Sequence, residues 1–470
     1  MGKAKKFTAA LLTAVLALSS FSSLAYQNGT RIEEQWSNAT LDYGVGDPYI
    51  MKYNGMYYLY CSTLDGQIGV KVWSSPDMVN WTYEGLCSSD TDTVMTGAYA
   101  PEVTYWNGTF YMYTAAPGGD QHRVLTADSP TGPFVRQGDV FTDPDDLIDG
   151  SVFIDDDPEA TKYFLHAGGS CIEYGILSDD MLTGTGKNQL SAATVIGHWT
   201  EGPSIFKRNG VYYMTYCGNH VNADNYMIEY AAGDSVTGMK EPEENLLLIN
   251  TEEGVTGLGH NSTVVGPDLD SRYIVYHNLV SNSAAPARRL NIDRLVFNGE
   301  KLEVQGPTWW EMDNPKIPEF YDRMETGDNW DILSGRGTVQ DGRMTLTGSS
   351  LLLSRESTPA DYTAEFNLSI SGYQSRSQAG AVISYGDDQN YAYVYFTPAD
   401  NTLHFAATVD GQTSELTAAL PAEYIYTEDV LRKLTVKKEG STFDIYADDR
   451  LLITAEAELE GGQIGLQSEG

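Results

Sequence analysis

Basic residues are scarce in this chain, and no long apolar run follows its N-terminal segment. Only 29 of the 470 residues are Lys or Arg, against 65 Asp and Glu, so the formal net charge is −36. A surface of that sign repels phosphate backbones and anionic lipids, and we therefore expect neither nucleic acid nor membrane partners. A neutral ligand such as a sugar would meet no such repulsion, although solubility alone accounts for most of the charge.

The first 25 residues have the three parts of a secretory signal. A basic region with three lysines precedes an apolar core at residues 9–18, and small residues from Ser23 to Ala25 form a cleavage site. The apolar core is too short and wrongly flanked to span a membrane. We therefore expect a secreted, extracellular protein without a membrane anchor.

Five segments in the first two thirds of the chain share a strand, a turn and a tyrosine-rich second strand. Each opens near an acidic or imidazole residue, and these residues follow one another at intervals of 55, 47, 52 and 59 positions: Asp47, Glu102, Asp149, Glu201 and His260. A period of that size predicts the five blades of a β-propeller. Since equivalent positions of the innermost strands converge on the propeller axis, we expect the five side chains to meet in one pocket.

So much buried negative charge is costly unless the site uses it, because like charges in one pocket cannot all ionise easily. Cleavage of a glycosidic bond is a reaction that uses several carboxyl groups in one pocket. One carboxyl group protonates the leaving oxygen, and another activates water or attacks the anomeric carbon. Crowding separates the pKa values of the carboxyls and so prepares an acid and a base. The sequence by itself leaves open which carboxyl takes which role.

The repeats end near Phe297, and a stretch rich in proline and tryptophan, QGPTWWEMDNPKIPEF, follows at residues 305–320. Beyond it, short alternating strands are separated by Gly, Asp-Gly and Asp-Asp turns, as in an antiparallel sandwich. No helix of convincing length is readable after residue 25. We therefore predict an all-β chain, with a five-bladed β-propeller over residues 26–318 and a β-sandwich of jelly-roll type over residues 319–470.

Several blade openings resemble motifs of glycoside hydrolase family 43, whose members are five-bladed propellers that invert anomeric configuration. The resemblance covers roughly residues 40–310 and keeps the order of the family's motifs. GDP around Asp47 resembles the motif of the general base, IDGS around Asp149 that of an aspartate which tunes and orients the acid, and TEGP around Glu201 that of the general acid. The resemblance implies these three roles for the three residues.

Four further residues complete the expected pocket. GHNS around His260 resembles the fifth-blade motif, whose histidine in many members contacts a central cation or water. A calcium ion at the axis is therefore one expectation, although no cofactor is required. Arg288 matches the family's substrate-holding arginine, with Arg289 as the alternative register. Glu102 is expected to line the pocket, and Trp199 is a candidate for stacking on a sugar ring, with a core role equally open.

Cysteine is scarce, with only four residues: Cys61, Cys87, Cys171 and Cys217. Export permits disulfides. However, Cys61 and Cys217 occupy matching places in blades one and four, which are not neighbours in a ring of five. Free thiols are therefore favoured, and a disulfide stays open. No paired Cys or His spacing indicates a zinc site.

The C-terminal part resembles concanavalin-like jelly rolls, including carbohydrate-binding modules attached to fructan and arabinan enzymes. AGAVISYGDDQNYAYVYF and GGQIGLQS carry this resemblance. It implies a glycan-binding domain, and a sandwich that only braces the propeller is the alternative. Tyr391, Tyr393 and Tyr395 alternate along one strand and share one face, which is either a sugar platform or the sandwich core.

Together these features predict a secreted, monomeric, inverting glycosidase that acts on side chains or oligosaccharides of plant cell walls. The resemblance favours an α-L-arabinofuranosidase or a β-xylosidase, and it also admits endo-arabinanases and galactan-cleaving members. A glycan-binding propeller without catalysis is the alternative from another class, and a cell-surface adhesin is a weaker one. The crowded carboxyls favour the enzyme, since a pocket that only binds gains nothing from them.

Overall fold

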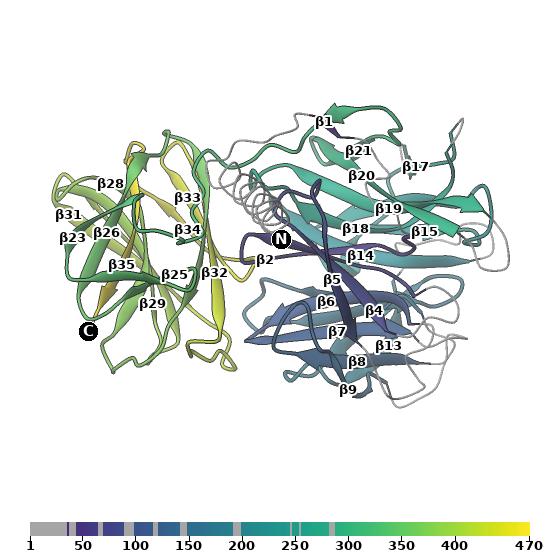
Figure 1. The fold of residues 1–470 in the computed structure, drawn as a ribbon, viewed down its shortest axis with the longest axis horizontal. Coiled ribbons are helices and arrows are strands. Elements are labelled where there is room, and N and C mark those ends of the chain that lie inside the picture. Colours follow the sequence, from purple (N-terminus) through teal and green to yellow (C-terminus); the bar gives the residue numbers. More distant parts are fainter. Residues whose placement is uncertain are drawn as a thin grey trace, which may run out of the picture.

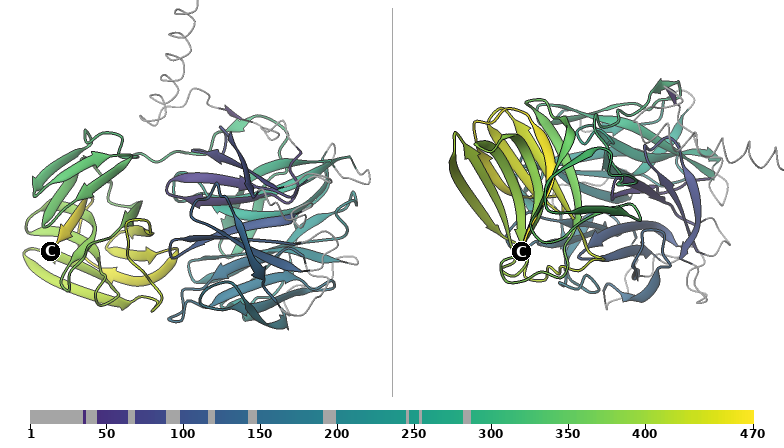
Figure 2. Two further views of the ribbon diagram at one scale, coloured as in Figure 1. Left: turned by 60° about the horizontal axis from the view of Figure 1, so that its bottom comes forward. Right: turned by 60° about the vertical axis from the view of Figure 1, so that its left-hand side comes forward.

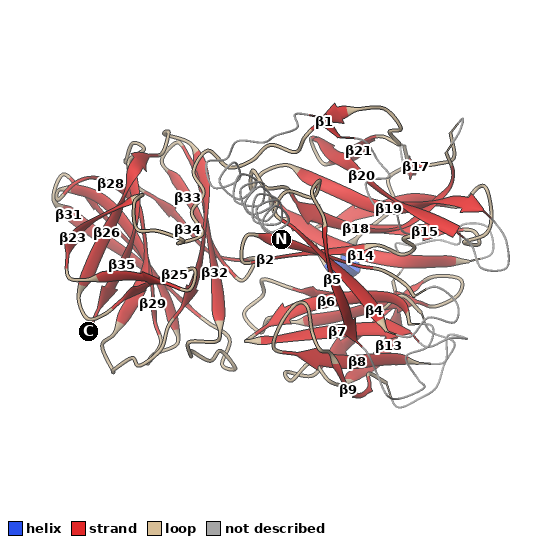
Figure 3. Cartoon of the chain, in the orientation of Figure 1, coloured by secondary structure: helices blue, strands red, loops and turns tan. Residues whose placement is uncertain are grey.

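The computed structural model describes residues 35–36, 44–63, 69–88, 98–115, 121–141, 148–190, 199–244, 247–252, 255–281 and 287–470. The predicted signal segment lies outside these residues. Within them the chain is almost wholly β, and the 3₁₀ turn η2 (Val236–Gly238) is the one helical element (Figure 3). No helix among the described residues is long and apolar enough to cross a membrane. The prediction of an all-β chain is confirmed.

Five four-stranded antiparallel sheets follow one another along the chain as the blades of a propeller (Figure 1). Blades 1 and 2 comprise β2 (Tyr49–Tyr53), β3 (Met56–Tyr60), β4 (Val70–Ser75), β5 (Thr82–Ser88), and then β6 (Tyr99–Trp106), β7 (Thr109–Ala115), β8 (His122–Ala127), β9 (Val135–Asp139). Blade 3 comprises β10 (Ser151–Ile154), β11 (Lys162–Ala167), β12 (Ile172–Leu177) and β13 (Gly184–Gln189).

Blades 4 and 5 comprise β14 (Thr200–Arg208), β15 (Val211–Gly218), β16 (Met227–Gly233), β17 (Leu247–Ile249), and then β18 (Thr256–Val265), β19 (Arg272–Ser281), β20 (Ala287–Asn298), β21 (Lys301–Gln305). Strands β1 (Gln35–Trp36) and β22 (Met312–Asp313) pair with each other outside the blades. Each blade is thus a local meander of consecutive strands.

The first two strands of blades 1, 2 and 4 are joined by two-residue Asn-Gly turns. Both residues of each turn have positive φ, with values of 50° and 71° at Asn54-Gly55, 52° and 94° at Asn107-Gly108, and 50° and 79° at Asn209-Gly210. Asn and Gly are the residues that adopt this conformation most readily, and the resulting turn matches the twist of the two strands. We call the end of the propeller that carries these turns the hairpin end.

The opposite end of each innermost strand carries a β-bulge, and we call this the bulge end. Pairing with the second strand is regular up to one residue, breaks for two residues, and resumes at the third, as between Glu201↔Cys217 and Ser204↔Thr215. The first bulge residue has a left-handed backbone in all five blades, with φ between 43° and 63°: Asp47, Ala100, Asp149, Gly202 and His260. Such a bulge bends the strand and redirects its side chains.

This register corrects part of the sequence interpretation. The five opening residues do not occupy equivalent positions, because only Asp47, Asp149 and His260 are first bulge residues. Glu201 precedes the bulge of its blade, and Glu102 follows the bulge of its own, where pairing resumes with Tyr113. A two-residue bulge cannot be read from strand periodicity, which assumes an unbroken alternation.

The C-terminal part is a sandwich of two antiparallel sheets. A seven-stranded sheet has the order β23-β26-β35-β28-β29-β30-β31, and a four-stranded sheet has the order β27-β32-β33-β34. The strands of the first sheet are β23 (Trp330–Ser334), β26 (Ser350–Ser357), β28 (Gln378–Asp387), β29 (Asn390–Thr397), β30 (Thr402–Val409), β31 (Gln412–Ala419) and β35 (Gln463–Glu469). Those of the second are β27 (Tyr362–Ser369), β32 (Leu431–Glu439), β33 (Thr442–Ala447) and β34 (Arg450–Glu456), and β24 (Gly337–Gln340) and β25 (Arg343–Leu346) form a separate hairpin.

The tyrosines of β29 do not enter the core between these sheets. Val394 and Phe396 point into that core, so Tyr393 and Tyr395 lie on the opposite face of the seven-stranded sheet. There the two rings stack with centroids 4.9 Å apart, and Tyr395 stacks on His404 at 4.6 Å. Both tyrosines are buried there in an apolar cluster with Leu353 and Val382. They thus belong to a second core cluster of the sandwich and not to the core between its two sheets.

The sandwich lies against the hairpin end of the propeller, beside blades 1, 2 and 3 (Figures 1 and 2). Lys52, near the end of β2, forms an ion pair with Glu365 at 2.8 Å, and Lys162 pairs with Glu423 at 2.9 Å. The buried Arg450 reaches across from β34. Its guanidinium donates to the backbone oxygen of Asp155 at 2.9 Å and to that of Asp157 at 2.5 Å.

Arg450→Ala should lower the free energy of unfolding by about 3 kcal/mol, because two buried carbonyl oxygens lose charge-assisted hydrogen bonds. Calorimetry should show this as a lower melting temperature, with activity on a small aryl glycoside nearly unchanged. Arg355→Ala is the matched control, since its pair with Asp331 is more than half exposed and such pairs contribute about 0–1 kcal/mol. Equal melting temperatures for the two variants would contradict the assignment of Arg450 as an anchor.

Candidate active site

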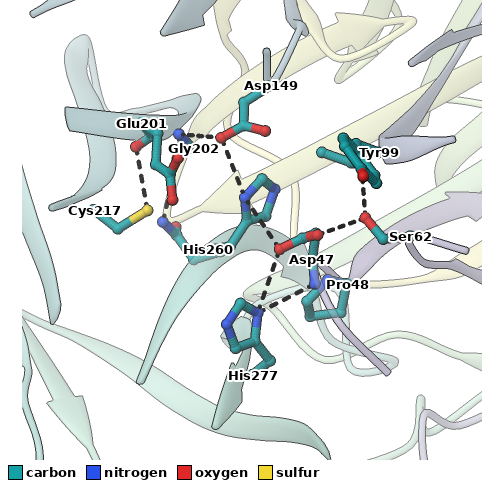
Figure 4. A network of polar contacts seen from close by, with 12 residues as sticks. Asp47, Pro48, Ser62, Tyr99, Asp149, Glu201, Gly202, Cys217, His260 and His277 are labelled. Atoms are coloured by element: carbon teal, nitrogen blue, oxygen red, sulfur yellow. Dashed lines mark hydrogen bonds and ion pairs between the residues drawn. The ribbon is translucent and has the colours of Figure 1, made fainter. Parts of the chain in front are cut away.

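Asp47, Asp149 and His260 meet at the bulge end of the propeller axis (Figure 4). The His260 Nδ1 atom lies 3.4 Å from Asp149 Oδ2 and 3.6 Å from Asp47 Oδ1, and all three side chains are buried. Burial alone would lower the pKa of His260, but the neighbouring carboxylates of Asp149 and Asp47 outweigh it and raise the pKa to about 10. The imidazole is therefore a cation at neutral pH, held between two aspartates.

The Asp47 carboxylate is surrounded by donors and positive charge. Burial would raise its pKa, but Arg288, His260 and His277 overcome burial and hold the pKa below its usual range. Arg288 Nη1 donates to Oδ1 at 2.5 Å, and the Ser62 hydroxyl donates to Oδ2 at 2.5 Å. Asp47 is thus ionised at any working pH and can accept a proton from a water molecule.

Arg288 can reach Asp47 because residue 46 is glycine. A Cβ atom at Gly46 would overlap the Arg288 guanidinium, so the GDP sequence needs its glycine for close approach. The neighbouring Arg289 is exposed. The structure therefore places Arg288, and not Arg289, at the site.

Glu201 has the opposite environment. Burial and the neighbouring Asp149 raise its pKa to about 8, so this carboxyl keeps its proton at neutral pH. Trp199 Nε1 donates to Oε2 at 2.5 Å, and the Tyr226 hydroxyl donates to Oε1. Asp149 Oδ2 accepts from the Gly202 backbone N–H at 3.0 Å and so holds the strand next to Glu201. The two carboxyls thus have the protonation states that a general acid and a general base require.

Glu102 shares the environment of Glu201, in which burial favours the protonated carboxyl group. Burial raises its pKa to about 8, against a hydrogen bond from Ser151 that lowers it. Its charged neighbours include His260 and Asp149. The structure thus brings together every site residue that the sequence indicated, with Trp199 in contact with Glu201 and Glu102 neutral at pH 7.

Sequence reasoning missed four residues at this site: Ser62, Cys217, Tyr226 and His277. Three of them share one position, because Ser62, Cys217 and His277 each pair with the residue that precedes the bulge of its blade. Had the bulge positions been known, the strand pairing would have identified these three residues. Tyr226 lies outside any repeat and left no signal.

The cysteines are all free and buried in the structure. Cys217 belongs to the site, and Cys61 lies one residue before Ser62, the true equivalent of Cys217 in blade 1. The matching of Cys61 with Cys217 was therefore wrong by one position.

A calcium ion at the propeller axis stays a prediction. No group of three or more His, Cys, Asp or Glu side chains among the described residues is arranged to hold a metal. His260 Nδ1 faces two carboxylates as a charge partner.

Comparison with known proteins agrees with this geometry. A family model described as Glycosyl hydrolases family 43 matches residues 37–301. The chain is 29% identical over 286 residues to the Beta-D-galactofuranosidase xynD of Aspergillus niger, which covers 55% of this chain and 82% of that protein. It is also 29% identical over 339 residues to the Arabinoxylan arabinofuranohydrolase of Paenibacillus polymyxa, covering 57% of this chain and 52% of the relative. The chain thus spans about half the length of this second relative.

Solved structures extend the comparison. A thermostable family-43 glycoside hydrolase is 31% identical, with a TM-score of 0.52, and covers 58% of this chain and 96% of that chain. The Bacteroides ovatus Xyloglucan PUL GH43B structure has a TM-score of 0.53 at 18% identity and covers 93% of this chain and 96% of its own. The second likeness shows that the fold, sandwich included, occurs in other proteins.

The charged His260 makes stability depend on pH. An unfolded histidine loses its proton near pH 6.5, whereas the folded one keeps it to about pH 10. The unfolded state thus binds fewer protons in this window, and the free energy of unfolding should fall by up to about 1.4 kcal/mol per pH unit as pH rises.

Denaturant unfolding of the wild type and of His260→Gln at pH 6.5, 7.5, 8.5 and 9.5 measures this contribution. Glu102 and Glu201, whose pKa values are also raised, lower stability in both proteins as pH rises. The variant should therefore show a shallower decline and not a flat line. Identical slopes would mean that His260 is neutral in the folded protein.

Proposed function

The chain belongs to glycosyl hydrolases family 43, a family of inverting glycosidases, and we propose that it is a secreted α-L-arabinofuranosidase or β-xylosidase of plant cell-wall glycans. The observation that carries the proposal is that one site holds both an ionised Asp47 and a protonated Glu201. Relatives named as arabinoxylan arabinofuranohydrolases and as a xylosidase/arabinosidase support the sugar class. Secretion rests on the N-terminal segment alone.

In the proposed reaction, Asp47 takes a proton from a water molecule as that water attacks the anomeric carbon. The new C–O bond forms on the face opposite to the glycosidic bond, which breaks as Glu201 gives its proton to the leaving oxygen. Inversion follows from this single displacement. Arg288 and Ser62 keep the base in place. Asp149 and Trp199 do the same for the acid and its strand.

For the sandwich we propose a bracing role. Its contacts reach the hairpin end of blades 1, 2 and 3, which is the end away from the carboxyls. Glycan binding by the sandwich is the alternative, and saturable binding of arabinan or xylan outside the catalytic pocket would favour it.

Glu201→Ala should separate the acid from the base by leaving-group dependence. Natural substrates leave as alkoxides that need a proton, so their hydrolysis should fall by about 10² to 10⁴-fold. A dinitrophenyl glycoside has an acidic leaving group, and most of its rate should remain. Asp47→Ala should lose activity on both substrates alike, since the water then lacks its base.

The control for this comparison is Asp149→Asn, which should shift the pH optimum while substrate binding persists. Equal losses of Glu201→Ala on both leaving groups would refute its role as the acid. A fully active Asp47→Ala would refute the proposed mechanism as a whole.

The sugar specificity needs a panel of substrates. Aryl α-L-arabinofuranoside and aryl β-xyloside should be hydrolysed with inversion, seen by proton NMR of the first-formed product. Arabinan, arabinoxylan and galactan then separate side-chain removal from endo cleavage and from galactan cleavage. Because one relative is named a galactofuranosidase, the aryl β-D-galactofuranoside belongs in the same panel. No turnover of any of these would favour the glycan-binding alternative.

A further inference from the structure

Tyr226 lies directly before β16 and is fully buried beneath the site. Its hydroxyl donates to Glu201 Oε1, and no sequence motif pointed to it. The other polar neighbour of this hydroxyl is the Cys217 sulfur, 2.9 Å away. Since sulfur is a weak acceptor and a carboxyl oxygen a strong one, the Tyr226 hydroxyl donates its hydrogen bond to Glu201 and not to Cys217.

We propose that Tyr226 is the positioning residue of the general acid and that it holds the Glu201 carboxyl group in one orientation. The Tyr226 hydroxyl donates to Oε1, and the Trp199 indole N–H donates to Oε2. The two donors restrain both oxygens of the carboxyl group. This inference rests on the proposed role of Glu201 as the acid.

The surroundings of Tyr226 restrict it to this position. Its ring stacks on the His277 ring, with centroids 5.8 Å apart and planes 20° apart. A Cβ atom at residue 259 would overlap the ring, so Gly259 of the GHNS sequence makes the space for it. The Cys217 sulfur lies 3.2 Å from the Glu201 backbone oxygen and fills the volume below. The phenol therefore has one available direction, toward Glu201.

The same contacts join the acid to the base. His277 Nδ1 accepts a hydrogen bond from the Asp47 backbone N–H at 3.1 Å. The chain of contacts runs from Glu201 through the Tyr226 hydroxyl and ring to His277, and on to Asp47. Tyr226 thus helps to fix the separation of the two carboxyls as well as the orientation of one of them.

Loss of the hydroxyl has a defined electrostatic consequence. The hydrogen bond from Tyr226 lowers the pKa of Glu201, against the larger effects of burial and Asp149. Without it the pKa of Glu201 should rise further. The alkaline limb of the kcat/KM profile should therefore move to higher pH, which a purely structural defect would not cause.

The test is Tyr226→Phe, assayed on a natural oligosaccharide and on a dinitrophenyl glycoside beside Glu201→Ala. We expect a loss of about tenfold on the oligosaccharide, a fraction of what the whole acid contributes, little loss on the dinitrophenyl substrate, and an alkaline limb at higher pH. Tyr230→Phe is the matched control, because Tyr230 is equally buried on β16 but bonds the Leu302 backbone N–H. It should change neither the leaving-group dependence nor the pH limb.

A ring-fluorinated tyrosine in place of Tyr226 keeps the shape and strengthens the donor, so it tests the proposal even if Tyr226→Phe fails to fold. It should move the alkaline limb to lower pH. If Glu201→Ala shows leaving-group dependence while both Tyr226 changes leave the limb in place, the positioning role is overturned. If Glu201→Ala shows no such dependence, the proposed acid itself is wrong, and the two failures are thereby distinguished.

Discussion

A left-handed residue at the bulge of each innermost strand is the constraint on which the site depends. Four of these five residues are not glycine, and each such residue costs about 1–2 kcal/mol relative to a right-handed one. The cost persists because the strand on either side is paired within its blade. In return, residues before, within and after the bulge all turn toward the axis. Glu201 precedes it, Asp47, Asp149 and His260 occupy it, and Glu102 follows it.

The charges at the axis are arranged so that burial becomes tolerable. His260 and Arg288 are cations beside the carboxylates of Asp47 and Asp149. Burial raises the pKa of both Glu102 and Glu201 to about 8, so each keeps its proton at neutral pH and adds no charge. Positive and negative groups thus balance in a site that solvent barely reaches. The balance also separates the pKa values of Asp47 and Glu201, which is what two complementary proton transfers need.

Repeat spacing and short motifs predicted the all-β fold, the five blades and the residues that meet at the axis, because tyrosine-rich hairpins and acidic openings recur visibly in the chain. Three features could not be predicted in this way. The bulge shifts the register by an amount that alternation does not encode, so Glu102 and Glu201 were aligned with the wrong positions. His277 on β19 and Tyr226 directly before β16 belong to segments that carry no motif. The charge of His260 could not be predicted either, because it depends on neighbours that the sequence does not place together.

Blade 5 explains how Glu201 and Asp47, the proposed acid and base, keep their separation. Glu201 belongs to blade 4 and Asp47 to blade 1, which are the two neighbours of blade 5 in a ring of five. Blade 5 supplies the groups between them, with His260 on β18, His277 on β19 and Arg288 on β20. Arg288 and the two imidazoles contact Asp47, and the His277 ring supports the tyrosine that holds Glu201. Because the sandwich is attached at the opposite end of the propeller, this spacing is set by the blades themselves.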